Sequence, residues 1–406
     1  MSRREGGGSR GNHGLPHVFG ATLAGAWLVA AALLWRTSVP SLEVPDLEPS
    51  SLFDAETLSR NARYENGLAA LWVLGLGLQL VALWLLARRA PSLPGPLLFR
   101  AALMGALVFA TLWLAELPVR LGVHWWRRRY DVSELGYLGY LAGPWSTTLG
   151  ELALAAIAGL AIVAAGRLLG RRAWLGLWAA FVALAVAYVL VYPSLLAPRL
   201  RPLQDRQLAT QIQQLGARIG LEEVEVEVRK ARERTRAVNA EAIGAGPTTR
   251  VILWDTLLAP EVGRGEVRFA AAHELGHVAR RHPWKGVVWF ALLALPGAWL
   301  LGRVARLREP PALPRVALVL LLLQLATLPL ANAISRRYEA EADAVGLRLT
   351  RDGRAAEALY RRFARTSLSD PDPPLLLHLL RDTHPTLAER IATARAGVPP
   401  GDPGSP

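Results

Sequence analysis

The chain has 406 residues, of which 52% are hydrophobic, and it carries a formal net charge of +13. So large an apolar fraction, gathered into long runs, excludes an ordinary soluble domain of this size. Because the chain contains no cysteine, disulfides, thiolate zinc sites and a cysteine nucleophile are all excluded. Any metal must therefore be bound by imidazole and carboxylate groups.

Apolar runs that are long enough to cross a bilayer occur about seven times along the chain. The first follows a basic N-terminus, but its Gly-rich lead and the apolar residues up to Trp35 favour an uncleaved span over a signal peptide. Arginines beside the runs explain the positive charge as anchors at lipid headgroups, so we expect a lipid bilayer and no nucleic acid as partner. The runs lie near 18–35, 67–87, 97–115, 149–169, 173–196, 286–304 and 315–333.

Polar segments separate these runs and define the expected organisation. In the longest one, "LQDRQLATQIQQLGARIG" predicts an amphipathic helix, while "VEVEVR" and "TRVILW" predict strands with a turn at "AIGAGPTT". Two spans follow it and return the chain to the same side of the membrane, so the two polar segments can form one domain. The expected parts are a flexible N-terminus (1–17), a five-span membrane domain (18–197) with an acidic, irregular loop (36–66), the first part of the polar domain (198–285), spans 6 and 7 (286–333), the helical second part (334–395) and a disordered tail (396–406).

The stretch "AAHELGHVARRHP" holds His273, Glu274 and His277 in an HExxH pattern. On a helix, two histidines four residues apart share a face and can bind one zinc ion. Glu274 then lies beside the metal, where a carboxylate can take a proton from an activated water molecule. The Ala-rich residues before the pattern and the absence of proline until Pro283 indicate that this segment is helical.

A catalytic zinc site needs a third protein ligand. His282 lies five residues after His277, about 140° from the ligand face of a continuous helix, so we expect it to pack at the helix end or at the interface. In "SRRYEAEADAVGL", Glu339 and Asp343 share one helix face, and the hairpin of spans 6 and 7 brings both to the membrane face that carries the HELGH segment. The sequence therefore predicts one Zn²⁺ per chain, with Glu339 as third ligand and Asp343 orienting a ligand histidine.

Several motifs, taken together with these residues, resemble the integral-membrane zinc CAAX prenyl proteases (type 1), with the HtpX-like membrane proteases as shorter relatives. The number of predicted spans fits the seven-span CAAX type better than the four-span HtpX type. The motifs that carry the resemblance follow in the order "YPSLLAPRLRPL" (192–203), "VNAEAIGAGPTTRVILWDTLL" (238–258), "AAHELGHVARRH", "SRRYEAEADAVGL" and "THPTLAERI" (383–391).

The resemblance implies a predominantly α-helical, polytopic membrane protein with a gluzincin-type metalloprotease domain made of helices and a small β-sheet. It implies that Glu274 is the general base and later the proton donor. Asn239 and Ala240 would lie on a strand that pairs with an extended substrate backbone. His384 and Arg390 would approach from the C-terminal region, where they would stabilise the tetrahedral intermediate or buttress the metal ligands.

The favoured function is that of a membrane-embedded zinc endopeptidase, a hydrolase whose substrate is a peptide or protein that is membrane-associated or lipidated. An HtpX-like protease that removes damaged membrane proteins is the alternative. A non-catalytic zinc-binding membrane scaffold is a third interpretation, which Glu274 argues against because a structural site does not need that carboxylate.

The expected location is a cell membrane that the chain crosses several times. The Ala/Arg/Leu-rich, lysine-poor composition suggests a high-GC bacterium and hence its inner membrane. Arginines in the short loops lean slightly against a cytoplasmic catalytic side, whereas the family resemblance places that side in the cytoplasm. We follow the resemblance and expect a cytoplasmic catalytic domain.

Overall fold

The computed structural model describes residues 14–39, 44–196, 199–221 and 224–397. The chain divides into two compact units, residues 1–37 and 38–406. Helix α1 (Gly14–Trp35) belongs to the first unit and contains the first predicted run. Residues 1–13 of the predicted flexible N-terminus and residues 398–406 of the predicted tail lie outside the described residues, while 14–17 are helical.

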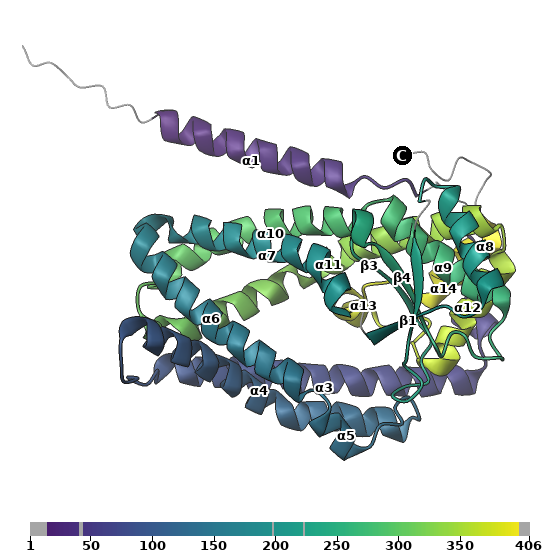
Figure 1. The fold of residues 1–406 in the computed structure, drawn as a ribbon, viewed down its shortest axis with the longest axis horizontal. Helices are drawn as coiled ribbons and strands as arrows, with labels where there is room; N and C mark the ends of the chain where they lie inside the picture. Colours follow the sequence, from purple (N-terminus) through teal and green to yellow (C-terminus); the bar gives the residue numbers. More distant parts are fainter. Residues whose placement is uncertain (1–13, 40–43, 197–198, 222–223, 398–406) are drawn as a thin grey trace, which may run out of the picture. The chain divides into compact units, whose positions relative to one another are not determined.

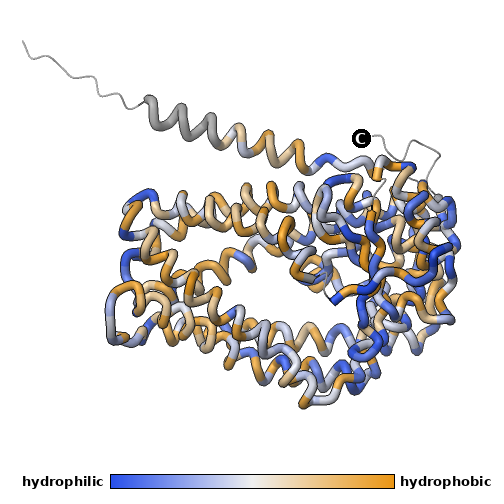
Figure 2. The backbone as a smooth tube through the Cα atoms, viewed as in Figure 1, coloured by the Kyte–Doolittle hydropathy of each residue, from blue (hydrophilic) through white to orange (hydrophobic). Residues whose placement is uncertain are grey.

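Long apolar helices make up much of the second unit, and Figure 2 shows hydrophobic residues along them and hydrophilic residues gathered around the strands. Five segments of the described chain are long and apolar enough to cross a membrane, one of which includes both α6 and α7. Every predicted run lies in a helix, but the number of seven crossings stays a prediction. The long helices are α3 (Ala55–Arg88), α4 (Leu97–Arg129), α6 (Trp145–Leu169), α7 (Ala173–Leu196), α10 (His282–Val304) and α11 (Leu313–Thr350), with short helices α5 (Tyr137–Ala142), η1 (Gly170–Arg172) and η4 (Pro310–Ala312) between them (Figure 1).

The segment 36–66 differs from the irregular loop that the sequence predicts. Helix α2 (Pro49–Leu52) lies within it, and α3 already begins at Ala55. Asp54 caps α3 by accepting a hydrogen bond from the Thr57 backbone N–H at 2.8 Å. The polar first turns are also held from outside, because the buried Asn61 amide donates to the Ala364 carbonyl at 2.8 Å. Tertiary contact therefore supports a helix here where composition alone indicated a loop.

A four-stranded sheet lies beside the membrane helices, with the strand order β1-β2-β4-β3. Strands β2 and β4 are parallel, and the two outer strands pair with them in antiparallel fashion, so β3 forms one edge of the sheet. The predicted strands at "VEVEVR" and "TRVILW" are confirmed, whereas Ala242 and Ile243 belong to β3 and not to the turn. The strands are β1 (Leu200–Pro202), β2 (Glu225–Arg229), β3 (Ala240–Ile243) and β4 (Arg250–Trp254), with η3 (Gly246–Thr248) between β3 and β4.

The remaining helices pack around this sheet and complete the domain. The predicted amphipathic helix is confirmed as α8 (Arg206–Ala217), and its buried face joins the same core as β4 and the helices that follow. Phe269, Leu275 and Val345 are fully buried in this core, which thereby joins the two polar segments across the hairpin of α10 and α11. These helices are α9 (Arg264–Ala279), α12 (Gly353–Thr366), α13 (Leu375–Arg381) and α14 (Leu387–Ala396).

Candidate metal centre and substrate cleft

The HExxH pattern lies on α9, as the sequence predicts. Glu266 closes the start of this helix, because its carboxylate accepts a hydrogen bond from the Gly263 N–H at 2.9 Å and pairs with Arg362 at 2.7 Å. The three alanines before His273 are buried, so this part of α9 is packed closely against its neighbours. A helix held in this way gives the two histidines a rigid base.

Three side chains converge on one point with the spacing that a metal requires. His273 Nε2 lies 3.1 Å from His277 Nε2 and 3.2 Å from Glu339 Oε2, and His277 Nε2 lies 3.4 Å from Glu339 Oε1. Ligand atoms about 2.0–2.1 Å from a tetrahedral zinc lie about 3.3 Å from one another. Within the described residues, this is the one His/Cys/Asp/Glu group whose ligand atoms could hold a metal ion. The donor set and its spacing therefore fit zinc.

Close contact between α9 and α11 brings the third of these side chains into place. A Cβ on Gly276 would lie 3.1 Å from the Ala342 Cα, closer than most such contacts, so glycine at this position allows the two helices to approach without displacing α11. Glu339 lies one turn before Ala342 on α11 and is buried beside the two histidines. The predicted meeting of the HELGH segment with the end of the last span is thus present in the fold.

A buried ion pair supports His273 from behind. The Asp343 carboxylate accepts from His273 Nδ1 at 2.7 Å and from Arg390 Nε and Nη2 at 2.8 and 2.6 Å. Burial lowers the pKa of His273, but the adjacent Asp343 and Glu339 carboxylates outweigh it and raise that pKa to about 10. The centre therefore favours positive charge, which is what a cation-binding site needs. Of the two roles expected for Arg390, the contacts favour buttressing over contact with a reaction intermediate.

His282 lies at a different place from the one that the helical wheel predicts. The wheel assumed a continuous helix, but α9 ends at Ala279 and Arg281 adopts a left-handed conformation with φ of 55°. The chain turns there, and His282 Nδ1 comes within 2.9 Å of His277 Nδ1. Sequence spacing did not assign this contact, because a backbone break between two helices changes every angle that follows it.

Glu274 faces a cavity of about 370 Å³ that is bounded on its other side by the edge strand β3. Burial raises the pKa of Glu274, while the two neighbouring histidines and the Ala242 backbone N–H lower it by a smaller amount. Ala240 begins β3, and Asn239 immediately precedes it; both line the same cavity. A carboxylate with a raised pKa, a metal-ligand group and an open strand edge thus share one space.

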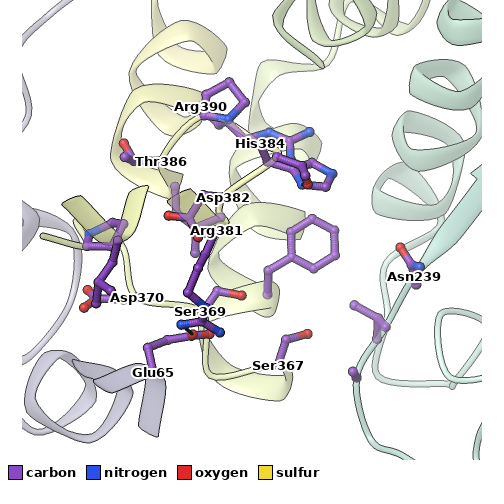
Figure 3. Close-up of a pocket in the computed structure, with 18 of the residues that line it drawn as sticks. Glu65, Asn239, Ser367, Ser369, Asp370, Arg381, Asp382, His384, Thr386 and Arg390 are labelled. Carbon is purple, nitrogen blue, oxygen red and sulfur yellow. Dashed lines mark hydrogen bonds and ion pairs between the residues drawn. The ribbon is translucent and has the colours of Figure 1, made fainter. Parts of the chain in front are cut away.

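His384 lies at the boundary between this cavity and a second one of about 390 Å³. Its Nε2 is 3.3 Å from Glu339 Oε2, and its side chain is 55% exposed. Figure 3 shows His384 and Arg390 together at one end of the second cavity, with Asn239 on the opposite wall. His384 therefore contacts Glu339 and also lines both cavities beside Asn239.

Comparisons with known proteins agree with this geometry. Residues 202–398 match the sequence model of Peptidase family M48, and this stretch contains the three metal-ligand candidates together with Glu274. The chain is 30% identical over 241 residues to an uncharacterized metalloprotease, YhfN, of Bacillus subtilis, a match that covers 55% of this chain and 56% of that protein. It is 27% identical over 233 residues to a CAAX prenyl protease 1 homologue of Arabidopsis thaliana, covering 53% and 54%. The predicted resemblance to this group of membrane metalloproteases is confirmed.

The fold of this chain is similar to that of a solved structure. The crystal structure of S. mikatae Ste24p superposes with a TM-score of 0.66 at 18% identity, covering 91% of this chain and 96% of that one. The predicted α-helical, polytopic membrane fold with a small sheet is thereby confirmed. The chain spans about half the length of the curated relatives it matches.

Proposed function

We propose that this chain is a membrane-embedded, zinc-dependent endopeptidase that hydrolyses a peptide bond held along β3. The convergence of His273, His277 and Glu339 at zinc spacing, with Glu274 facing the same cavity, carries the proposal. A purely structural zinc site has four protein ligands and needs no base beside it. A catalytic site has three protein ligands and a free position for water.

Zinc held by the two histidines and Glu339 would supply a Lewis acid that polarises the peptide carbonyl and lowers the pKa of water towards about 7. Glu274 accepts the proton of the attacking water and then donates it to the leaving amine, a role that its raised pKa suits. The edge of β3 pairs with the substrate backbone and holds the scissile carbonyl near Glu274. His384 offers a donor to the oxygen on which negative charge develops.

A larger cavity among the membrane helices favours a membrane-associated or lipidated substrate. This cavity of about 700 Å³ lies between α3, α4 and α11 and shares Arg381 and Thr383 with the cavity beside His384. Part of its wall is apolar, with Trp72, Leu76 and Leu325 among the lining residues. A peptide bound along β3 could therefore place an attached lipid against apolar side chains. We place the enzyme in a bacterial inner membrane with its catalytic domain in the cytoplasm.

Metal removal tests the proposal. The full chain in detergent should lose peptide cleavage when zinc is chelated and regain it when zinc alone is returned, because no other group in the cavity replaces the Lewis acid. Two peptides of identical sequence, with and without a C-terminal isoprenoid, form the matched substrate pair. We expect the higher kcat/KM for the prenylated peptide.

Other outcomes of this experiment support the two other interpretations. Equal cleavage of both peptides, together with faster cleavage of a destabilised membrane protein, would favour the quality-control protease. Stoichiometric zinc with no cleavage of any of the three substrates would contradict the enzyme proposal and favour a scaffold. A reporter fused to the C-terminus determines which side of the membrane carries the catalytic domain.

A further inference from the structure

His277 Nδ1 faces away from the metal-ligand group. It contacts a series of hydrogen-bonded side chains that the proposed reaction does not use. His277 Nδ1 lies 2.9 Å from His282 Nδ1, and His282 Nε2 lies 3.0 Å from Glu341 Oε2. The other oxygen of Glu341 accepts hydrogen bonds from the Ser38 hydroxyl at 2.7 Å and from the Ser38 backbone N–H at 2.8 Å. This series of hydrogen-bonded side chains runs from the candidate metal ligand His277 to Ser38.

We propose that His282 is a positioning residue, which fixes the ring orientation and the proton of the ligand His277 by way of Glu341. The inference rests on the proposed zinc-dependent function. Ligand histidines almost always donate their second ring N–H to a carboxylate or carbonyl, and that partner sets the orientation and basicity of the ligand. Here an imidazole stands between the ligand and its carboxylate.

The donors and acceptors of this hydrogen-bonded series can be assigned in only one way. When His277 binds a metal through Nε2, its proton is on Nδ1, and it donates to His282 Nδ1. His282 then carries its own proton on Nε2 and donates to Glu341. The Glu341 carboxylate ends the series, because one of its oxygens accepts from His282 and the other accepts from Ser38. Arg280 Nε and Lys285 Nζ, each 3.7 Å from Glu341, favour its ionised form.

Packing also holds the His282 ring in place. The His282 ring stacks on Tyr338 with centroids 4.4 Å apart and an angle of 11°, and its side chain is 5% exposed. Tyr338 and Glu341 both lie on α11, the helix that also supplies Glu339. One helix therefore provides a ligand directly and orients a second ligand through His282. His273 has a separate arrangement, in which Asp343 accepts its proton directly.

The test replaces His282 with phenylalanine, which keeps the ring on Tyr338 and removes both hydrogen bonds. We expect zinc affinity, measured on the full chain by competition with a chelator, to fall about 10- to 100-fold. His124→Phe is the matched control, because His124 is also buried and also stacks on a tyrosine, Tyr140, with centroids 4.1 Å apart at 9°. Zinc affinity should be unchanged in that variant.

Two further variants separate positioning from general loss of structure. In His282→Asn the amide oxygen takes the place of Nδ1 as acceptor, so it should recover part of the affinity and the wild-type absorption spectrum of the Co²⁺-substituted protein. Glu341→Gln keeps an acceptor but removes the negative charge, so its zinc affinity should lie between those of wild type and His282→Phe. This variant still tests the inference if His282→Phe does not fold. Wild-type affinity in His282→Phe, or an equal loss in His124→Phe, would overturn the inference. Because zinc affinity is read without substrate, an inactive wild type that binds zinc would refute the proposed activity alone.

Discussion

Replacing Glu274 with glutamine is expected to reduce peptide turnover about 10²- to 10⁴-fold while zinc remains bound. Glutamine has nearly the same size and can still accept the hydrogen bond from the Ala242 N–H, but it cannot accept the proton of water. The two histidines and Glu339 are unchanged, so the metal content should stay at one zinc per chain. Single-turnover measurements on the cleavable peptide, with zinc measured by elemental analysis, check both halves of this expectation.

Glu266 provides the matched control for that substitution. It is a second buried carboxylate on α9, but it bonds Gly263 and Arg362 at the start of the helix and does not line the cavity. Glu266→Gln should therefore lower the unfolding temperature without changing kcat. Full peptidase activity in Glu274→Gln would refute the assignment of Glu274 as base. Loss of zinc from it would show that this side chain supports the ligands instead.

The convergence of His273, His277 and Glu339 could be predicted from the sequence because these parts obey simple geometric constraints. Two histidines four residues apart must share a helix face, and two consecutive spans must return the chain to one side. Those two constraints are enough to bring Glu339 to the HELGH helix, and the fold places its carboxylate 3.2 Å from His273. The other long-range contacts of the site depend on details of packing that no such constraint expresses.

Contacts that depend on a local backbone break could not be predicted in this way. The left-handed residue Arg281 turns the chain between α9 and α10, so His282 returns to His277 instead of pointing away from it. Ser38 reaches Glu341 across some three hundred residues of sequence, and no periodicity encodes such a contact. The polar start of α3 was also missed, because the local Asp54 cap acts together with distant partners such as the Ala364 carbonyl, which the sequence does not reveal.

The contacts of Arg390 support one of the two roles that the motif leaves open. The resemblance allowed it either to contact the reaction intermediate or to support the ligands. Its guanidinium donates from Nε and Nη2 to Asp343 and lies over the Tyr360 ring at 4.5 Å from the centroid, so two of its nitrogens are engaged in supporting the residue behind His273. His384, which is half exposed and lies 3.3 Å from Glu339, remains the residue that can reach a bound substrate.

Removing Arg390 is expected to destabilise the domain that holds α9 and α14 by about 3–5 kcal/mol, because it leaves the buried Asp343 carboxylate without its guanidinium partner. The side chains of the pair are 7% and 4% exposed, so solvent does not compensate. Arg390→Met keeps the length of the side chain without its charge. Thermal unfolding of the metal-free full chain measures this effect apart from zinc binding, and the unfolding temperature should fall by several degrees.

A double variant shows whether the unpaired charge causes that loss. Adding Asp343→Asn to Arg390→Met removes the buried carboxylate, while the amide oxygen can still accept the proton of His273 Nδ1. The double variant should therefore be more stable than Arg390→Met alone, and the difference is the cost of leaving the buried Asp343 carboxylate with His273 as its remaining partner. The stability of Arg390→Lys should lie between those of Arg390→Met and the double variant, because an ammonium restores the charge but not the two parallel hydrogen bonds. If the double variant is less stable than either single one, packing of Arg390 on Tyr360 outweighs its charge, and the ion pair is not what stabilises this side of the metal centre.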